Sequence, residues 1–268
     1  AQKHSLALLL SQEDDFLTTL RDRVQAEAEK QGCTLDYYTA EGDAETQLSQ
    51  AHEALAAGAD TLIVNLTSED SGRQIAAIVG DANIVFINRA PTDRSVLNDK
   101  TVFVGVDEAL CGMLQGQELA AYFQKNWVGT EIRYLLFQGV PNLENTLERS
   151  NGALQGLIDA GFTPVPAAEF QVCDFYRDRA RAAMTELLAT GTAYDCVICN
   201  NDAMALRAGD LYVTVKQDAA VQAETAVAAA MNLSSGQPFD AGLDFPLEIN
   251  GQAVPYSIYI PASVAIAD

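Results

Sequence analysis

The chain has 268 residues, of which 49% are hydrophobic and 20% are charged. This is enough for one large hydrophobic core or two of ordinary domain size, and no low-complexity tract indicates disorder. The formal charge of -21 opposes the phosphate backbone and argues against nucleic acid as a partner. The apolar runs, of which SLALLL is typical, are far too short to span a membrane.

The first hundred or so residues alternate between short apolar runs and amphipathic stretches. The apolar runs are SLALLL, TLDYY, TLIVN, IVFIN and VFVGV, with amphipathic stretches at 14–31, 44–57 and 69–79. The runs are continuously apolar, which indicates burial on both faces and hence a parallel sheet with helices on each side. Phe16, Leu20 and Val24 recur with the helical period, so we expect this face to pack on the sheet.

From about residue 109 the same rhythm begins again. Helices are expected to about 123, at 143–160 and at 176–190, between the strands IRYLLF, 163–170 and YDCVIC. A last helix at 218–234 precedes a strand pair around Asn250-Gly251 that closes with VPYSIYI. The pattern predicts the α/β class, with two doubly wound parallel-sheet domains.

Polar residues follow the apolar runs, where open parallel sheets bind their ligands. These strand-end residues are 11–15, Asn65, Asn88-Arg89, Asp107-Glu108, Gln138, 200–202 and 216–218. Two aromatic residues, Phe16 and Phe175, lie near them in the sequence. Amides, carboxylates and a guanidinium make paired hydrogen bonds to neighbouring hydroxyls, and aromatic faces cover C–H patches. The set suits a polyhydroxylated ring. The alternative is that each residue is a helix cap or a turn residue.

The cysteines and histidines give no sign of catalysis. Five cysteines, at 33, 111, 173, 196 and 199, are an odd number, and Cys196 and Cys199 point to opposite faces of one strand. Buried free thiols are therefore favoured over a redox or metal pair. His4 and His52 have no evident catalytic partner, and no nucleotide-binding, metalloprotease or serine-hydrolase motif occurs. We expect no enzyme activity, no metal and no cofactor.

Nine segments, in order along nearly the whole chain, resemble the ribose/galactose type of periplasmic sugar-binding protein, the solute receptor of sugar ABC transporters. They are SQEDDFLTTLRDRVQAEAEKQG, AGADTLIVNLTS, NIVFINRAP, VFVGVDEALCGMLQGQELA, LFQGVPN, LERSNGALQGL, CDFYRDRARAAM, CNNDAMAL and AGDLYVTVKQDAA. The resemblance implies a type I periplasmic-binding-protein fold, with lobes of 1–107 plus about 218–248 and of 108–217 plus about 249–268. Three crossovers join the lobes, which close around the ligand.

The resemblance also implies a set of ligand contacts and partners. The ligand, a monosaccharide or polyol, would be contacted by Asp14, Asp15, Phe16, Asn65, Asn88, Arg89, Asp107, Phe175, Asn201 and Gln217. A monomer would present it to a membrane ABC permease in the periplasm or another extracytoplasmic place, and a lipid anchor at the cell surface is an alternative. The alternative hypothesis is that the chain is the effector-binding core of a sugar-responsive transcription repressor. A complete repressor would require a DNA-binding helix-turn-helix before the first strand.

Three departures from the family pattern stand out. Asn88 replaces the Asp that the family often has, and Leu147 replaces the ligand-binding Arg of ribose-type members. Between about Leu206 and Arg207, a segment on the order of thirty residues, the size of one crossover unit, is absent. Either the chain has lost a strand of the second sheet or the sequence omits residues that the polypeptide has. A parallel sheet cannot spare a central strand, which favours the omission.

Overall fold

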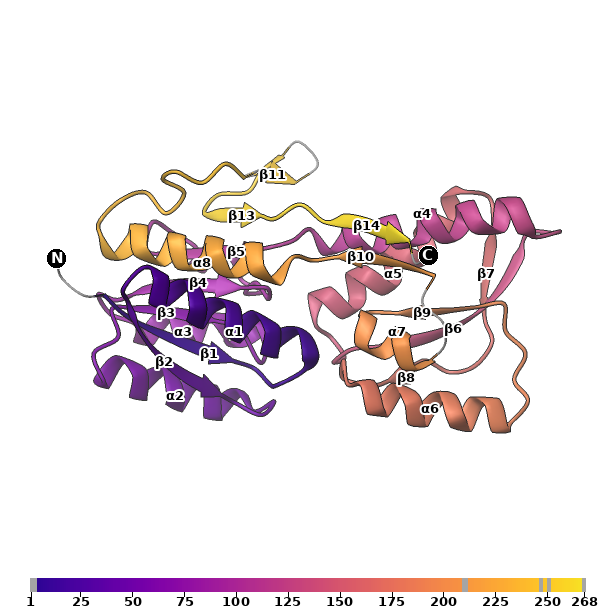
Figure 1. Cartoon of the computed structure of the whole chain (residues 1–268), viewed down its shortest axis with the longest axis horizontal. Coiled ribbons are helices and arrows are strands. Elements are labelled where there is room, and N and C mark those ends of the chain that lie inside the picture. The colour runs from indigo at the N-terminus through magenta and orange to yellow at the C-terminus, as the bar shows by residue number, and fades with distance from the viewer. Residues whose placement is uncertain (1–3, 209–211, 246–247, 250–251, 267–268) are drawn as a thin grey trace. The chain divides into compact units, whose positions relative to one another are not determined.

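The computed structural model describes residues 4–208, 212–245, 248–249 and 252–266. The chain forms two compact units, each with its own sheet (Figure 1). The first unit is Ala1–Val106 with Asp218–Pro261, and the second is Asp107–Gln217 with Ala262–Asp268. The chain therefore crosses between the units three times, after Val106, Gln217 and Pro261. The predicted α/β class with two parallel-sheet units is confirmed.

The sheet of the first unit has six strands in the order β13-β5-β4-β3-β1-β2, all paired in parallel. The strands are β1 (Ser5–Leu10), β2 (Thr34–Thr39), β3 (Thr61–Val64), β4 (Asn83–Ile87), β5 (Thr101–Gly105) and β13 (Ser257–Tyr259). The inner strands β3, β4 and β5 are buried along their whole length, as continuous apolar runs predict. The edge strand β2 is partly exposed.

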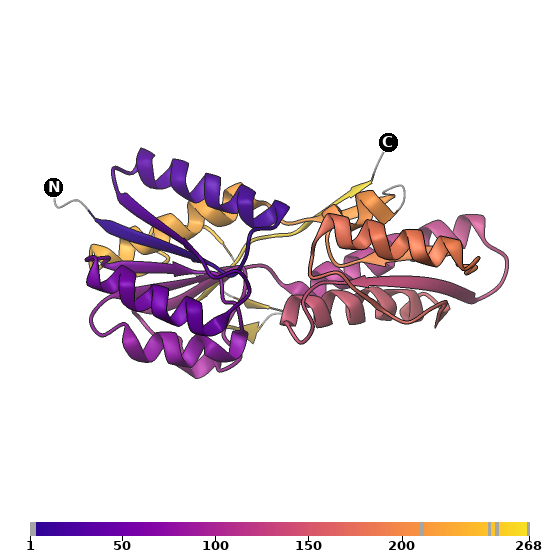
Figure 2. The ribbon, with the colours of Figure 1, turned by 90° about the horizontal axis from the view of Figure 1, so that it is seen from below.

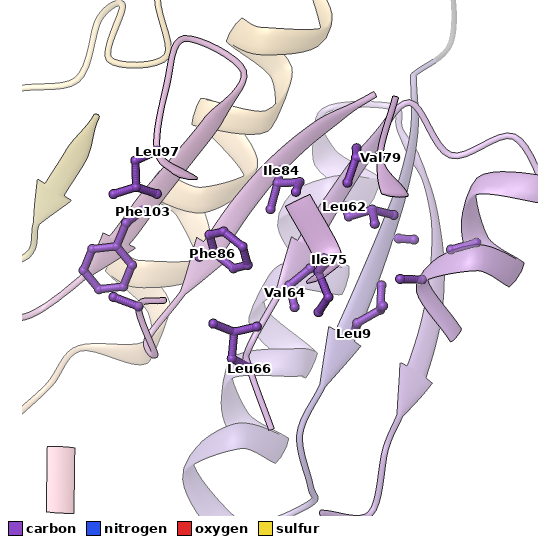
Figure 3. Packing of buried hydrophobic residues seen from close by; sticks show 14 of the residues in the cluster. Leu9, Leu62, Val64, Leu66, Ile75, Val79, Ile84, Phe86, Leu97 and Phe103 are labelled. Atoms are coloured by element: carbon purple, nitrogen blue, oxygen red, sulfur yellow. The ribbon is translucent and has the colours of Figure 1, made fainter. Parts of the chain in front are cut away.

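Helices cover both faces of this sheet (Figure 2). Helices α1 (Asp15–Lys30) and α8 (Ala219–Ser234) lie together on one face, and α2 (Ala44–Ala56) and α3 (Gly72–Ile78) lie on the other. Two short 3-10 helices, η1 (Glu69–Ser71) and η2 (Arg94–Val96), lie in the connections. Figure 3 shows the core beneath α2 and α3, which includes Leu9, Val64, Ile75, Phe86 and Phe103.

The start of α1 differs slightly from the sequence prediction. Asp14 is the N-cap, and its carboxylate accepts a hydrogen bond from the backbone N–H of Leu17 at 2.8 Å. Leu17, Leu20 and Val24 are buried, whereas Phe16 is half-buried. Leu20 and Val24 therefore face inward as the helical period predicts, and Leu17 takes the place of Phe16 in the first turn.

The second unit is built around β6 (Glu131–Gln138). It pairs in parallel with β7 (Thr163–Pro166), β8 (Gln171–Val172) and β9 (Cys196–Cys199). Hydrophobic cores lie on both faces, one beneath α4 (Glu108–Asn126) and α5 (Glu144–Asp159), and the other beneath α6 (Arg177–Ala189) and α7 (Asp202–Ala208). A separate antiparallel pair is formed by β10 (Val213–Lys216) and β14 (Ser263–Ile266).

The strand pairing of the second unit is interrupted between β9 and β10. Among the described residues, β9 pairs with β6 alone and β10 pairs with β14 alone. Helix α7 has seven residues, and β10 begins five residues after it ends. The first unit has no such break in its described sheet. The interruption falls at the position where the resemblance to the family indicates that a strand is missing from the sequence.

Residues 249–261 lie in a different unit from the one that we expect from the sequence. The expected second lobe includes 249–268, but the first unit extends to Pro261 and only the residues after it belong to the second. The reason is that β13 adds to the first sheet beside β5, with Ser257 opposite Phe103. The predicted strand pair is present as β11 (Glu248–Ile249) and β12 (Gln252–Ala253), and its turn at 250–251 lies outside the described residues.

Helices α4 and α5 pack at unusually short range because each carries two glycines at the contact. A Cβ atom added to Gly112 would lie 2.6 Å from the carbonyl oxygen of Arg149, and one added to Gly116 would overlap the carbonyl of Ala153. A Cβ atom on Gly156, across the contact, would lie 2.8 Å from a backbone nitrogen of α4. The backbones of the two helices therefore touch directly, with no room for a side chain between them.

Candidate functional site

Four buried polar residues lie together just beyond the carboxyl ends of β1, β3 and β4. We call Ser11, Asn65, Asn88 and Arg89 the first-unit polar cluster. Asn65 Oδ1 accepts from Ser11 Oγ at 2.6 Å, and Asn65 Nδ2 donates to Asn88 Oδ1 at 3.2 Å. Arg89 Nη1 donates to Ser11 Oγ at 2.9 Å. The hydroxyl of Ser11 thus joins Asn65 to Arg89, and Asn65 binds Asn88 directly, so three residues of the predicted site are linked.

The backbone and the burial of this cluster restrict its side chains. Asn88 has a φ of 65°, in the left-handed region that Asn adopts more easily than most residues. Arg89 is only 3% exposed, and it also donates to the backbone carbonyl of Leu66 at 3.0 Å. A buried guanidinium fixed by hydrogen bonds to its own unit presents a planar, rigid group of donors, the type of group that binds hydroxyl oxygens.

The predicted ligand contacts at the start of α1 are Asp14, Asp15 and Phe16, and each has a different environment. Both carboxylate oxygens of Asp14 accept hydrogen bonds, Oδ1 from Leu17 N at 2.8 Å and Oδ2 from Gln12 Nε2 at 3.2 Å. Asp14 is therefore a helix cap, as the alternative interpretation of the strand-end residues predicts. Asp15 is exposed in the first turn of α1, and Phe16 is half-buried after it.

In the second unit, the structure brings Phe175 and Asn201 together. Asn201 Nδ2 donates to the carbonyl oxygen of Phe175 at 3.1 Å, and Asn201 Oδ1 caps α7 by accepting from Met204 N at 3.0 Å. Phe175 has a φ of 68° and is 4% exposed. Its ring lies directly against Gly139, where a Cβ atom would overlap it. The position of this ring therefore depends on a glycine at the end of β6.

Glu108 connects Asp107 and Gln217, the other two predicted residues of the second unit. It follows Asp107 in the chain and accepts a hydrogen bond from Gln217. Asp107 caps α4 by accepting from Leu110 N at 3.0 Å. Gln217 Nε2 donates to Glu108 Oε2 at 3.0 Å. Glu108 is in turn bound by Arg149, with Nε 2.6 Å from Oε2 and Nη2 2.8 Å from Oε1. A buried ion pair thus holds one of the predicted ligand residues.

The electrostatics around this pair are those of a buried charge with a matched partner. Burial opposes the charged form of Arg149, but the adjacent carboxylate of Glu108 favours it, and the pKa of Arg149 is raised above its ordinary value. Burial and the same carboxylate raise the pKa of the Cys111 thiol to about 12. Cys111 is therefore a neutral thiol at physiological pH and no nucleophile.

The structure adds residues that the sequence prediction does not select. Ser11, Glu108 and Asn200 belong to the strand-end runs, so a signal for them existed, but the family resemblance favours their neighbours. Asn200 Oδ1 accepts from Gly139 N at 3.0 Å, and Asn200 Nδ2 donates to Ser150 Oγ at 3.0 Å. No sequence pattern selects Arg149, because nothing in the sequence indicates that it contacts Glu108, which lies 41 residues before it.

The described residues contain no group of three or more His, Cys, Asp or Glu that could hold a metal ion. His4 Nδ1 contacts Asp60 Oδ2 at 3.3 Å near the start of β1, away from the strand ends that carry the polar cluster. All five cysteines are free thiols. Within the part of the chain that the structure describes, no helix is long and apolar enough to cross a membrane.

Comparison with known proteins gives a consistent result. Residues 7–209 match the model of the periplasmic binding protein domain. The ribose import binding protein of Bacillus subtilis is 28% identical over 194 residues, which are 72% of this chain and 60% of that protein. A Rhizobium meliloti protein assigned as rhizopine-binding is 26% identical over 88% of this chain and 86% of its own length.

Solved structures share the fold over almost the whole chain. An ABC transporter solute-binding protein of Bacillus halodurans with bound myo-inositol superimposes with a TM-score of 0.80 and 24% identity, covering 98% of this chain and 94% of that one. The Caulobacter myo-inositol binding protein gives a TM-score of 0.79 at 18% identity, over 100% and 94% of the two chains. The matched proteins are binding receptors of transporters and not enzymes. Because the family model matches residues 7–209, which are most of the chain, the chain belongs to the periplasmic binding protein family.

Proposed function

We propose that this protein is the solute-binding receptor of a carbohydrate ABC importer and that it captures a monosaccharide or polyol between its two units. The observation that carries the proposal is the first-unit polar cluster. It gathers two amides, a hydroxyl and a guanidinium at the carboxyl ends of neighbouring parallel strands. This donor and acceptor set suits neighbouring hydroxyl groups. The names of the relatives support the same class of ligand, since they include ribose and myo-inositol.

Binding would proceed by a change of conformation and not by a reaction. Each unit carries its own group of candidate ligand residues, and three crossovers connect the units. A ligand that contacts both units stabilises the closed arrangement over the open one, which is a population shift. The contacts in the first unit would come from Asn65, Asn88 and Arg89, with Asp14, Asp15 and Phe16 beside them. Asp107, Phe175, Asn201 and Gln217 would contribute from the second.

The partners and the place of action follow from this role. The closed receptor would deliver its ligand to a membrane ABC permease and would act as a monomer. Membership of the family implies an extracytoplasmic location. In that location the protein would be either free in a periplasm or held at the cell surface by a lipid anchor.

A thermal-shift screen tests the proposed function. The panel contains ribose, allose, L-arabinose, glucose, myo-inositol and glycerol, with amino acids of similar size as the negative set. A ligand at a hundredfold excess over its Kd is expected to raise the Tm by about 5 °C, because it binds only the folded state. Isothermal titration of the best compound then gives its Kd and stoichiometry.

Two results would contradict the proposal. A shift with amino acids and none with any sugar or polyol would place the ligand in another chemical class. A sugar response from a protein that is dimeric by light scattering would favour the effector-binding core of a repressor, because such cores act as dimers whereas transport receptors act alone.

A further inference from the structure

The ion pair between Arg149 and Glu108 is more deeply buried than surface ion pairs usually are. The side chain of Arg149 is 14% exposed and that of Glu108 is 7% exposed. Two nearly parallel contacts of 2.6 and 2.8 Å join the guanidinium to the carboxylate. A buried pair of this kind contributes little net stability, because removing both charges from water costs about as much as their attraction returns. Its presence therefore calls for a role other than stability.

Each partner of the pair holds a segment that carries predicted ligand residues. Glu108 directly follows Asp107 and accepts from the side chain of Gln217. Arg149 Nη1 donates to the carbonyl oxygen of Asn200 at 2.8 Å, one residue before Asn201. Asn201 in turn donates to the carbonyl of Phe175. Through hydrogen bonds and adjacent positions in the chain, the ion pair thus connects all four candidate ligand residues of the second unit.

The same pair lies at the crossovers of the chain. The first crossover follows Val106 and the second follows Gln217, so the bond from Gln217 to Glu108 ties the second-unit ends of both. The third crossover is tied to the second by strand pairing, since Lys216 lies opposite Ser263 in the β10–β14 pair. The second-unit ends of all three crossovers are therefore joined, two of them through Glu108.

The glycine contact between α4 and α5 fixes the geometry of the pair. Gly112 lies one helical turn after Glu108, and its backbone packs against the backbone of Arg149 itself. The two charged side chains therefore extend from backbones that touch, so their separation varies little. We propose that Arg149 and Glu108 are positioning residues, which hold the ligand residues of the second unit and tie two crossovers, so that sugar affinity depends on them. This inference rests on the proposed function.

The test compares two Arg→Lys substitutions in the same unit. Arg149→Lys keeps the charge but loses the planar fork that reaches Glu108 and Asn200 together. The matched control is Arg133→Lys, because Arg133 also makes two bonds to one carboxylate, that of Asp195, but near the amino end of β6. Titration calorimetry is done with the sugar that the unchanged chain binds, at a temperature where all three proteins are folded. The Tm without sugar is measured separately.

We expect Arg149→Lys to raise Kd about tenfold, the loss that follows when one charge-assisted hydrogen bond of a site is given up. Arg133→Lys should leave Kd within about twofold, whatever its effect on Tm. A purely structural role would lower the Tm of both variants and leave both Kd values unchanged. Equal Kd values for Arg149→Lys and the unchanged chain would therefore overturn the positioning role while leaving the proposed function intact.

A second variant keeps the test decisive if Arg149→Lys does not fold. The double substitution Glu108→Leu with Arg149→Met removes both charges and leaves neither buried alone, a change that is often neutral for stability. It should fold and bind the sugar at least tenfold more weakly, because Gln217 loses its hydrogen bond to the carboxylate of Glu108. Unweakened binding by the double variant would overturn the inference. If the unchanged chain binds no sugar or polyol at all, the proposed function fails and the positioning role fails with it.

Discussion

Arg89 is a charged side chain held within the first unit by oxygens of Ser11 and Leu66. Its 3% exposure means that the guanidinium has given up most of its contact with water. A charged group in such a place gains more from a hydrogen bond to a ligand oxygen than an exposed one does. At the scale of single residues, Arg89 is therefore the side chain on which the proposed function most depends.

Replacing Arg89 tests this dependence. Arg89→Ala is expected to weaken binding of the best sugar by about a hundredfold, because two or more charge-assisted hydrogen bonds are lost. The fold should be retained, as judged by circular dichroism. Arg73→Ala is the matched control, since Arg73 is 76% exposed and pairs with Asp93 at 3.5 Å on the surface. An unchanged Kd in Arg89→Ala would show that the ligand binds elsewhere.

Asp195 gives a pH-dependent contribution to the stability of the second unit. Its carboxylate accepts from the backbone and side chain of Arg133, at 2.8 to 3.1 Å, and its side chain is 5% exposed. The hydrogen bonds from Arg133 outweigh burial and hold the pKa of Asp195 below its ordinary value. A lowered folded-state pKa means that this stabilisation is complete above the unfolded-state pKa and is lost as pH falls through the folded one.

Asp195→Asn should therefore destabilise the protein at neutral pH and make no difference in acid. We expect a loss of about 1 kcal/mol at pH 7 that decreases as the pH falls below the ordinary pKa of Asp and disappears only below the lowered folded-state pKa. Urea unfolding across this range, followed by circular dichroism, measures the difference. Asp22→Asn is the control, because Asp22 is 65% exposed in its ion pair with Arg21. A difference that is constant with pH would show that the carboxylate charge is not what stabilises the unit.

At the scale of elements, helices α4 and α5 form the most closely packed pair of the second unit. Glycines on both helices let the two backbones touch, and the buried ion pair lies at one end of this contact. Glycine costs a helix up to about 1 kcal/mol relative to alanine, so four of them would weaken isolated helices. Their presence is explained by the contact and not by helix propensity.

Gly116→Ala separates these two effects because they have opposite signs. Helix propensity alone predicts a gain of about 1 kcal/mol, whereas the overlap of the new methyl group with the carbonyl of Ala153 predicts a loss of about 1–3 kcal/mol. We expect the loss to dominate in urea unfolding. Gln117→Ala, at the neighbouring exposed position of the helix, should be close to neutral. A stabilised Gly116→Ala would mean that the helices can move apart freely.

The sequence predicted the elements better than it predicted the contacts between them. Continuous apolar runs were sufficient to locate the buried strands, and the strand-end rule selected Asn65, Asn88 and Arg89, which the structure brings together in one cluster. The same rule could not separate caps from ligand residues, because Asp14 and Asn201 satisfy both descriptions. Which residues meet across a long sequence separation depends on the folded chain and not on a local pattern.

At the scale of the whole molecule, the two units are not built alike. The first has a six-stranded sheet and a separate pair, β11 and β12, whereas the described strands of the second form a four-stranded sheet around β6 and a separate pair, β10 and β14. Ser257–Tyr259 joins the first sheet because three buried residues there pair with β5, which a short apolar run near the chain end does not reveal. The proposed closure would therefore move a unit with a six-stranded sheet relative to one whose described sheet has four strands, with three crossovers between them.

The left-handed backbone of Asn88 limits how the receptor could be re-engineered. At a φ of 65°, only Asn, Asp and Gly are accepted without appreciable strain, and β-branched residues are the worst. A saturation library at this position would therefore contain few functional members. New ligand preferences would have to be sought at other positions, such as Leu147 of the second unit, where the backbone is an ordinary helix and the side chain is 44% exposed.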